Sequence, residues 1–308
     1  MPAWVRTAHN VRVGDRTFEL SNLEKVIYPE TGFTKAAVLD YYRRIAPFLI
    51  PHLKDRPLTL KRYPHGVDGP FFYQKQAPPN APSWLKTQAV WSREREAHVD
   101  YCLANDLASL MWLVNAGDLE LHTSLSRGTA IERPLSVVFD LDPGPTTDVV
   151  ACAHVALAVR DELQKRGLAS FAKVSGSKGM QMYAPLNTAT TYEATKPFAR
   201  SVAQAIERRA PGGVTSNMSK AQREGRIFID WSQNDQHKTT VNVYSLRAVA
   251  TPQVSAPVSW TEVERAAAKD DIEALRFHPD EVVRRAEKDG DLFEPLLSLK
   301  QQLPKATA

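Results

Sequence analysis

The order of secondary structure between residues 136 and 246 restricts the fold more than any other feature of this chain. The sequence predicts a strand at residues 136–141, a helix over about 147–166, and two strands on either side of a Ser-Gly-Ser-Lys-Gly loop. A second helix over about 193–209 and a strand at residues 226–232 complete the order βαββαβ, and one more strand follows. This order predicts a ferredoxin-like or RRM-like sheet with its first strand at the centre.

The segments around this sheet predict further parts of the same α+β domain. Thr34 is a candidate helix cap, and apolar residues recur at helical spacing from Val38 up to Pro51. Residues 105–117 predict a helix that ends at a glycine. Because no segment resembles a linker, we expect one domain over residues 1–308. Its parts are an N-terminal α/β lobe over about 1–130, an RRM-like catalytic lobe over about 131–255, and a charged helical segment over about 258–300.

Composition excludes several classes of protein. No run of the chain approaches the ~20 apolar residues that a membrane helix needs, so no membrane partner is expected. Cys102 and Cys152 are each flanked by apolar residues, which predicts buried free thiols in a reducing compartment. The formal charge of +4 is compatible with a polyanionic partner without demonstrating one. A soluble cytoplasmic protein is therefore the expectation.

Two aspartates stand at the end of the first predicted strand. Asp140 and Asp142 are two residues apart, so they point to the same face of the sheet. Two carboxylates repel each other there unless a cation lies between them, and Mg²⁺ or Mn²⁺ prefers such oxygen ligands. So short a motif also fits a turn in which Asp142 is a side-chain cap and Asp140 is solvated, and for a bare Asp-x-Asp this alternative is the commoner one.

A third carboxylate changes this balance. Asp230 stands at the end of the strand predicted at residues 226–232. In a ferredoxin-like sheet the first strand is flanked by the third, and we expect the sheet to bring Asp230 beside the other two aspartates. Three carboxylates at one edge suit a two-metal site for phosphoryl transfer. Taken alone, Asp230 fits a strand-end cap equally well.

Groups that bind anions occur close to these acids. The loop of residues 175–179 carries Ser175, Ser177, Lys178 and Gly179. Its small residues would let backbone N–H groups approach a phosphate, while the hydroxyls and the lysine would add donors and positive charge. It lacks the spacing of a Walker loop, and by itself it would be an ordinary hairpin. Lys238 and Arg247 add a basic pair after Asp230. Together these residues predict a metal–nucleotide site.

Four motifs in order resemble the polymerase domain of the bacterial non-homologous end-joining DNA ligases, in the archaeo-eukaryotic primase superfamily. They are "LVNAGDLELHT", "VVFDLDPG", "SGSKGMQMY" and "FIDWSQNDQHKTTVNVYSLRA", and the likeness extends over about residues 12–299. The chain departs from the family at Gln181, where a histidine is usual, and at Val243, where a proline is usual. The resemblance implies a primase-like catalytic core.

The resemblance also implies roles for individual residues. Asp140, Asp142 and Asp230 would bind two Mn²⁺ or Mg²⁺ ions. The NTP or dNTP substrate would contact residues of both lobes, namely Lys61, Arg62, His122, Ser175, Lys178, Gly179, Lys238 and Arg247. Asn22, Lys25 and Lys35 would bind a 5′-phosphate, and Phe71 and Phe72 would contact the template. Without the resemblance, these lysines would be surface residues at a helix start and the phenylalanines loop anchors.

The function expected is that of a DNA-repair primase-polymerase, a two-metal nucleotidyltransferase. It would add nucleotides, often ribonucleotides, to a primer 3′-hydroxyl at short gaps or break ends, and it would recognise the downstream 5′-phosphate. Three alternatives remain: a primer-independent DNA primase with the same aspartates, a non-catalytic RNA- or DNA-end-binding module, and a metal-dependent phosphohydrolase. The binding module predicts surface aromatics in the RNP pattern, which the strands predicted at residues 171–175 and 228–232 do not supply.

The sequence contains no ligase or phosphoesterase segment, which fits either an excised domain or a stand-alone, actinobacterial-type relative; the native-looking Met1 and the short tail suit the stand-alone relative. Its expected partners are DNA with gaps or breaks and a separate ATP-dependent DNA ligase, with the end-bridging protein Ku as a further candidate. The expected location is the bacterial cytoplasm, in association with the nucleoid.

Overall fold

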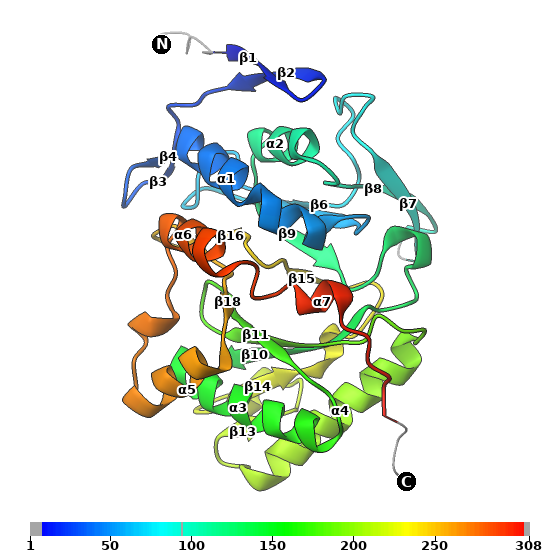
Figure 1. Cartoon of the computed structure of the whole chain (residues 1–308), viewed down its shortest axis with the longest axis vertical. Coiled ribbons are helices and arrows are strands. Elements are labelled where there is room, and N and C mark those ends of the chain that lie inside the picture. The colour runs from blue at the N-terminus through cyan, green and yellow to red at the C-terminus, as the bar shows by residue number, and fades with distance from the viewer. Residues whose placement is uncertain (1–7, 94, 305–308) are drawn as a thin grey trace.

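The predicted βαββαβ sheet is present in the computed structural model, which describes residues 8–93 and 95–304 (Figure 1). Its strands are β10 (Ser136–Pro143), β11 (Phe171–Val174), β12 (Met180–Pro185) and β14 (Ile227–Asp230), in the spatial order β14-β10-β12-β11. The short strands β13 (Val214–Thr215) and β18 (Pro257–Val258) extend it to six. Thus β10 is central as expected, flanked by the third strand of the motif, β12, and by β14, which carries Asp230.

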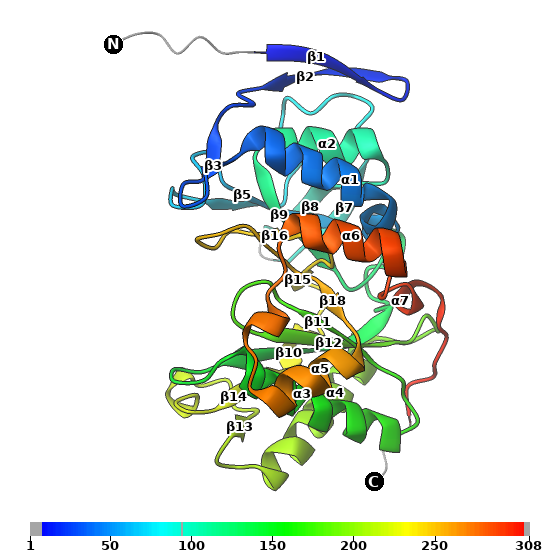
Figure 2. The same cartoon turned by 60° about the vertical axis from the view of Figure 1, so that its left-hand side comes forward.

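Helices cover one face of this sheet. α3 (Val149–Lys165) and α4 (Tyr192–Arg209) pack on it, and α5 (Trp260–Lys269) packs on α3 (Figures 1 and 2). In β10, Phe139 and Leu141 are fully buried, and the Leu141 carbonyl accepts a hydrogen bond from Cys152 of α3. Because side chains alternate along a strand, Asp140 points away from these helices, toward the upper lobe.

The upper lobe contains a second, four-stranded antiparallel sheet. Its order is β15-β9-β5-β6, from β5 (Leu58–Arg62), β6 (Phe72–Gln74), β9 (Asp118–Ser124) and β15 (Thr239–Val241). β15 follows β14 of the lower sheet in the sequence, but it pairs with β9 of the upper sheet. The helices α1 (Lys35–Leu53) and α2 (Leu107–Asn115) pack against each other above this sheet (Figure 1). The two lobes are therefore joined by strand pairing as well as by the chain.

Shorter elements complete the structure. They include the hairpin strands β1 (Ala8–Val13) with β2 (Arg16–Ser21), β3 (Val26–Tyr28) with β4 (Phe33–Thr34), β7 (Thr87–Ser92) with β8 (Ala97–Cys102), and β16 (Leu246–Arg247) with β17 (Gln253–Val254). After α5, the C-terminal segment forms α6 (Pro279–Asp289) and α7 (Pro295–Ser298), as its charged helical character predicted. In the part of the chain that the structure describes, no helix has the length and apolarity to cross a membrane.

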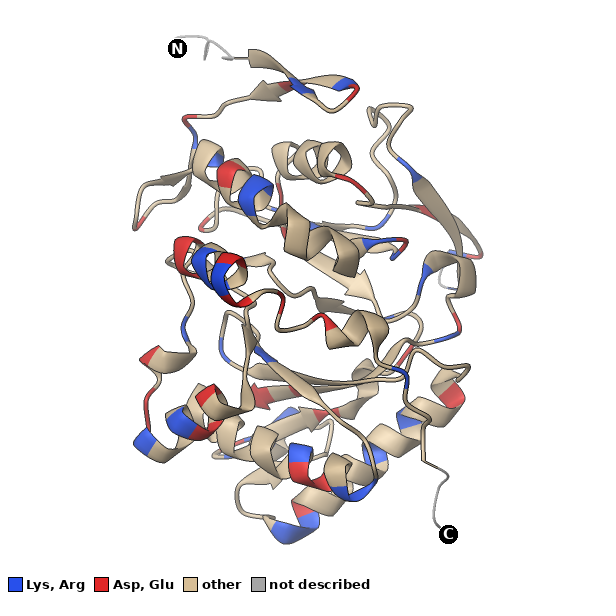
Figure 3. Ribbon diagram, viewed as in Figure 1, with Lys and Arg blue, Asp and Glu red and all other residues tan. Residues whose placement is uncertain are grey.

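Burial and charge follow the pattern expected of a mixed α/β protein. The buried apolar side chains of both lobes form one continuous cluster, as a single domain would require, although the domain boundaries stay a prediction. Cys102 and Cys152 are buried free thiols, as predicted. Figure 3 shows basic and acidic segments next to each other on α3, α5 and α6. The formal charge of +4 is thus not concentrated on one helix.

One buried side chain completes the pairing of the central strand. β14 pairs with β10 only from Asp140 onward, so the backbone of Val138 has no strand on that side. Asn234, fully buried, takes its place: its Oδ1 accepts from Val138 N at 2.9 Å, and its Nδ2 donates to Val138 O at 2.7 Å. An asparagine amide here acts as a one-residue substitute for a strand.

Replacement of this amide is expected to destabilise the fold. Asn234→Ala leaves a buried N–H and a buried C=O unpaired, and each costs about 1–3 kcal/mol. We expect the free energy of unfolding, measured by urea titration, to fall by roughly 2–4 kcal/mol. Asn80→Ala, at an exposed turn, should change it by less than about 0.5 kcal/mol. Equal stability of the two variants would contradict this role for Asn234.

Candidate active site

Strand register brings the three predicted aspartates to one region. Asp140 and Asp230 are direct partners across β10 and β14, and Asp142 lies two residues along the same face as Asp140. Burial, together with the charge of Asp142, raises the pKa of Asp140 to about 7. Burial and the charge of Asp230 raise the pKa of Asp142 as well. In the absence of a cation, this group of carboxylates is therefore under electrostatic stress.

The donor chemistry of the aspartates fits a hard divalent cation, but their side chains are not arranged around one. Among the residues described, no three His, Cys, Asp or Glu side chains are placed to hold a single metal ion. Asp230 has other partners: its Oδ1 accepts from Ser232 N and Oγ, and its Oδ2 accepts from Gln233 Nε2. Asp230 thus caps the short helix η3 (Trp231–Gln233), the alternative considered for it from the sequence. Its lone pairs would have to be shared with a metal.

The loop after β11 is built for close backbone approach. Ser175 N donates to Gly179 O at 2.8 Å, and Ser175 Oγ accepts from Gly179 N at 3.1 Å. A Cβ at Gly179 would lie 2.1 Å from Leu141 O, so only glycine lets the loop pack against the strand between Asp140 and Asp142. Lys178 lines a groove of about 910 Å³ that also borders the start of α3.

A residue that the sequence analysis missed organises the predicted cations. Glu120 of β9, 1% exposed, lies 3.2 Å from Lys61 Nζ, 3.0 Å from His122 Nε2 and 3.3 Å from Arg247 Nε. It also accepts from Tyr63 Oη and from Ala248 N. We call Glu120 with Lys61, His122 and Arg247 the Glu120 cluster. The only signal in the sequence was the "LELHT" motif, in which Glu120 faces the same side of the strand as His122.

The charges of this cluster depend on one another. Burial alone would raise the pKa of Glu120, but the hydrogen bond from His122 and the charge of Arg247 reverse this and hold the pKa well below its usual range. Burial lowers the pKa of His122, and Glu120 opposes that shift. Glu120 is therefore ionised and compensates the cations of the upper lobe.

Arg247 joins this cluster to the lower lobe. Arg247 forms an ion pair with Glu120, and its Nη1 donates a hydrogen bond to Ser175 O in the loop of residues 175–179. Residues from β5, β9 and β16 are thus held next to the loop between β11 and β12. The structure brings together Lys61, His122, Arg247 and Ser175, as the sequence predicted for a nucleotide pocket.

The residues predicted to bind a 5′-phosphate line one separate cavity. Asn22, Lys25 and Lys35 lie on its wall, and its volume is about 180 Å³. Lys25 Nζ donates to Pro64 O, and Lys35 Nζ donates to Ser21 O at 2.7 Å, so backbone carbonyls fix both ammonium groups. Asn22 has a left-handed backbone (φ 54°), which turns the chain at the rim. The grouping is that of a small anion pocket.

Four predicted residues lie outside these groups. Phe71 stacks on Tyr63 with ring centroids 5.3 Å apart, and Phe71 and Phe72 are each about half exposed. Arg62 donates to Gln74 and to Ala116 O, on the side away from Glu120. Lys238 donates to Ser232 Oγ, next to Asp230. The phenylalanines are therefore available for stacking, while Arg62 and Lys238 are not part of the Glu120 cluster.

A ferredoxin-like sheet with three aspartates on its central strands, facing a cluster of cations, is the architecture of a primase-polymerase. The comparisons with known proteins agree. The family model for the LigD primase-polymerase domain matches residues 34–293, and the chain belongs to this family. It is similar to the polymerase domain of Mycobacterium tuberculosis ligase D in complex with DNA, with a TM-score of 0.84 and 38% identity over 92% of this chain and 98% of that one.

Longer curated relatives show the same likeness. The chain is 40% identical over 285 residues to the multifunctional non-homologous end joining DNA repair protein LigD of M. tuberculosis (strain H37Rv). The aligned region covers 90% of this chain and 36% of that protein. It is 30% identical over 297 residues to the bifunctional non-homologous end joining protein LigD of Bacillus subtilis, with 93% and 47% covered. The chain thus spans a third to a half of these relatives.

The raised pKa of Asp140 predicts a pH-dependent cost to stability. Its pKa rises from an ordinary 3.8 to about 7 on folding, so the metal-free protein loses stability as the pH rises through that window. Asp140→Asn removes this charge. We expect the melting temperature of the variant in EDTA to exceed that of the parent by a margin that grows from pH 4 to pH 7 and is constant above. Asp15→Asn, at a fully exposed aspartate, should show no such trend.

The second prediction concerns the Glu120 cluster. Glu120→Gln keeps the shape of the side chain but leaves Lys61 and Arg247 without their buried counter-charge. Removing one partner of a buried ion pair costs about 3–5 kcal/mol, and we expect a loss near the lower figure in urea unfolding at pH 7. Glu132→Gln, more than half exposed beside Arg133, is the matched control and should be near neutral. A loss below about 1 kcal/mol would refute the central role of Glu120.

Proposed function

We propose that this protein is a gap-filling DNA-repair polymerase that adds NTP or dNTP, often ribonucleotides, to a primer 3′-hydroxyl. The observation that carries the proposal is the pairing of opposite chemistries across the two lobes. The aspartates of β10 and β14 lie in the lower lobe, the Glu120 cluster lies in the upper lobe, and Arg247 contacts Ser175 between them. A metal-bound triphosphate would complement both sides at once.

Each group of residues would have a distinct task. Asp140, Asp142 and Asp230 would hold two Mn²⁺ or Mg²⁺ ions. When bound, such ions activate the attacking hydroxyl and stabilise charge on the phosphates. Lys61, His122 and Arg247 would bind the triphosphate, and Lys178 and the N–H groups of the 175–179 loop would add further donors. Glu120 would keep these cations in place before the substrate arrives.

Recognition of broken DNA would use the separate cavity of Asn22, Lys25 and Lys35. Its two fixed ammonium groups suit a terminal 5′-phosphate, which carries more charge than a phosphate within a strand. The half-exposed Phe71 and Phe72 would stack on template bases. A similar solved domain in complex with DNA supports this assignment.

The biological setting follows from the family. We propose that the polymerase acts at double-strand breaks in the bacterial cytoplasm. A separate ATP-dependent DNA ligase would seal the filled ends, with Ku as a further candidate partner. Both proposals rest on the end-joining relatives, of which this chain spans only a part.

The test is primer extension on a duplex with a gap of a few nucleotides, with and without a 5′-phosphate downstream. We expect Mn²⁺-dependent addition that stops when the gap is filled and disappears in Asp140→Ala. The double variant Lys25→Gln, Lys35→Gln should need roughly 30-fold more DNA for half-maximal rate, and only on the phosphorylated gap. Loss of two contacts at about 1 kcal/mol each is about 2 kcal/mol, and every 1.4 kcal/mol is a factor of ten.

Controls separate this function from its alternatives. Lys54→Gln, an exposed lysine after α1, should leave the DNA dependence unchanged. Chains started without a primer would identify a primase instead, and release of inorganic phosphate or nucleoside monophosphate would identify a phosphohydrolase. Binding of the gap without any addition, for every metal and nucleotide, would leave only an end-binding role.

A further inference from the structure

A buried lysine lies in line with the aspartates. Strand register places Asp230, Asp140, Gln181 and Lys173 side by side, as successive partners across β14, β10, β12 and β11. Lys173 is 1% exposed, and none of the described carboxylates lies within ion-pair distance of it. Its Nζ donates instead to Gln181 Oε1 at 2.6 Å and to Ser255 Oγ at 2.7 Å. None of the roles proposed above accounts for the cost of burying this lysine.

These contacts determine which way the Gln181 amide points. Lys173 Nζ is a donor, so the atom it contacts must be the amide oxygen. The Tyr183 hydroxyl donates to the same oxygen at 3.2 Å. The NH₂ end is then left for Asp140, which strand register places directly opposite Gln181 on β10. The amide is thus oriented as a donor toward Asp140 by two donors behind it.

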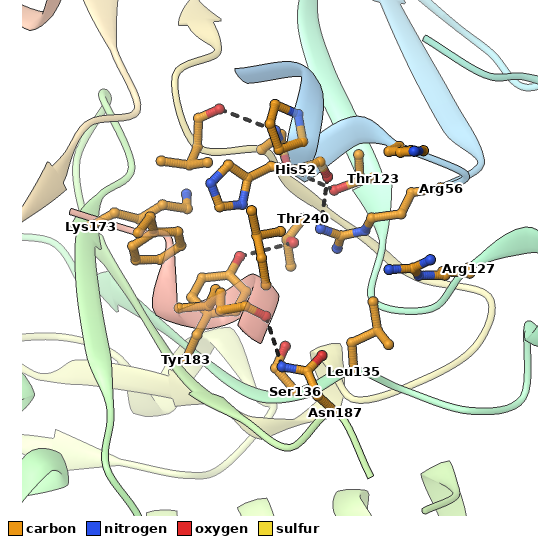
Figure 4. A pocket seen from close by; sticks show the side chains of 17 residues that line it. His52, Arg56, Thr123, Arg127, Leu135, Ser136, Lys173, Tyr183, Asn187 and Thr240 are labelled. Atoms are coloured by element: carbon orange, nitrogen blue, oxygen red, sulfur yellow. Dashed lines mark hydrogen bonds between the residues drawn. The ribbon is translucent and has the colours of Figure 1, made fainter. Parts of the chain in front are cut away.

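The surroundings hold the lysine in this position. Figure 4 shows Lys173 and Tyr183 on one side of a small cavity of about 40 Å³, with Tyr183 bonded to Thr240 of the upper sheet. Lys173 Nζ lies 5.9 Å from the centre of the Tyr183 ring. Ser255, which also contacts Lys173, is fully buried and donates to Val174 O. No part of this network needs the substrate in order to form.

We propose that Lys173 is a positioning residue that acts through Gln181 to fix the Asp140 carboxylate for metal binding. The inference rests on the proposed function, because it takes Asp140 as a metal ligand. Groups that orient a ligand from behind typically change metal affinity 10–100-fold when removed. The relay needs only N–H donors on Lys173, so it operates whether the amine is charged or neutral.

The relay is chemically compatible with the histidine that is usual in the family at the position of Gln181. A neutral histidine can accept from Lys173 with one ring nitrogen and donate to Asp140 with the other. Glutamine offers the same acceptor and donor in one side chain. The substitution therefore keeps the polarity of the relay while changing its shape.

The test measures Mn²⁺ affinity by isothermal titration on nucleotide-free protein, as a double-mutant cycle of Lys173→Met and Gln181→Met. Each single variant should bind Mn²⁺ at least ~10-fold more weakly, and the double variant about as weakly as either single one, because both break one relay. Loss of a positive charge by itself would strengthen cation binding. Weaker binding by Lys173→Met is thus the result that a purely electrostatic role does not give.

Controls keep the outcome interpretable. Lys165→Met removes an exposed lysine of α3 and should leave Mn²⁺ affinity unchanged. Gln181→His should stay within about threefold of the parent while Gln181→Met does not, a comparison that holds even if Lys173→Met fails to fold. Thermal unfolding in EDTA reports folding for every variant.

Two results would overturn the inference. The first is Mn²⁺ binding by Lys173→Met that is as tight as in the parent or tighter. The second is a loss of Mn²⁺ affinity in the double variant that equals the product of the losses in the two single variants. If the parent extends primers and either result occurs, the proposed function stands and the relay alone is wrong. A parent that neither binds Mn²⁺ nor extends primers would refute both.

Discussion

The buried carboxylate of Glu120 is the interaction on which the candidate site depends. Without it, the cations Lys61 and Arg247 would repel each other at the contact between the lobes, and His122 would lose its partner. With it, the three side chains are held together in one place within the protein itself. Because Arg247 also donates to Ser175 O, the same carboxylate indirectly positions the loop of the lower lobe. Prepared cations of this kind need little reorganisation when the substrate binds.

In the lower lobe the crowded charges are negative. Its three aspartates lie close together, and among the described residues no three His, Cys, Asp or Glu side chains are placed to hold a metal ion. Burial and mutual repulsion raise the pKa values of Asp140 and Asp142. Both carboxylate oxygens of Asp230 accept hydrogen bonds from residues of η3. The two halves of the site therefore differ. Lys61 and Arg247 have a counter-charge in Glu120, whereas burial and repulsion of Asp140 and Asp142 are not fully compensated within the protein. A metal–triphosphate complex would relieve the acids directly, while it would have to compete with Glu120 for the cations.

Much of this arrangement could be predicted from the sequence, because it depends on local patterns. Short apolar runs and turn residues predicted β10, β12 and β14, and strand order then predicted that Asp230 would lie beside Asp140. What escaped prediction depends on contacts distant in the sequence. Glu120 meets Arg247 over more than a hundred residues, and Asn234 replaces a strand beside Val138. Lys173 was read only as part of a strand, because nothing local indicates that its ammonium group faces Gln181 rather than solvent.

The pairing of β15 with β9 has a consequence for how the molecule can be divided. The chain enters the upper lobe, builds the lower sheet, returns to lay residues 239–241 along β9, and then goes back to add β18 to the lower sheet. A fragment that ends near residue 130 would contain β9 with one side of its backbone unpaired, and exposed strand edges invite association with other chains. The lobes are therefore interleaved by topology. Neither corresponds to a continuous piece of the sequence that could be exchanged by a single cut.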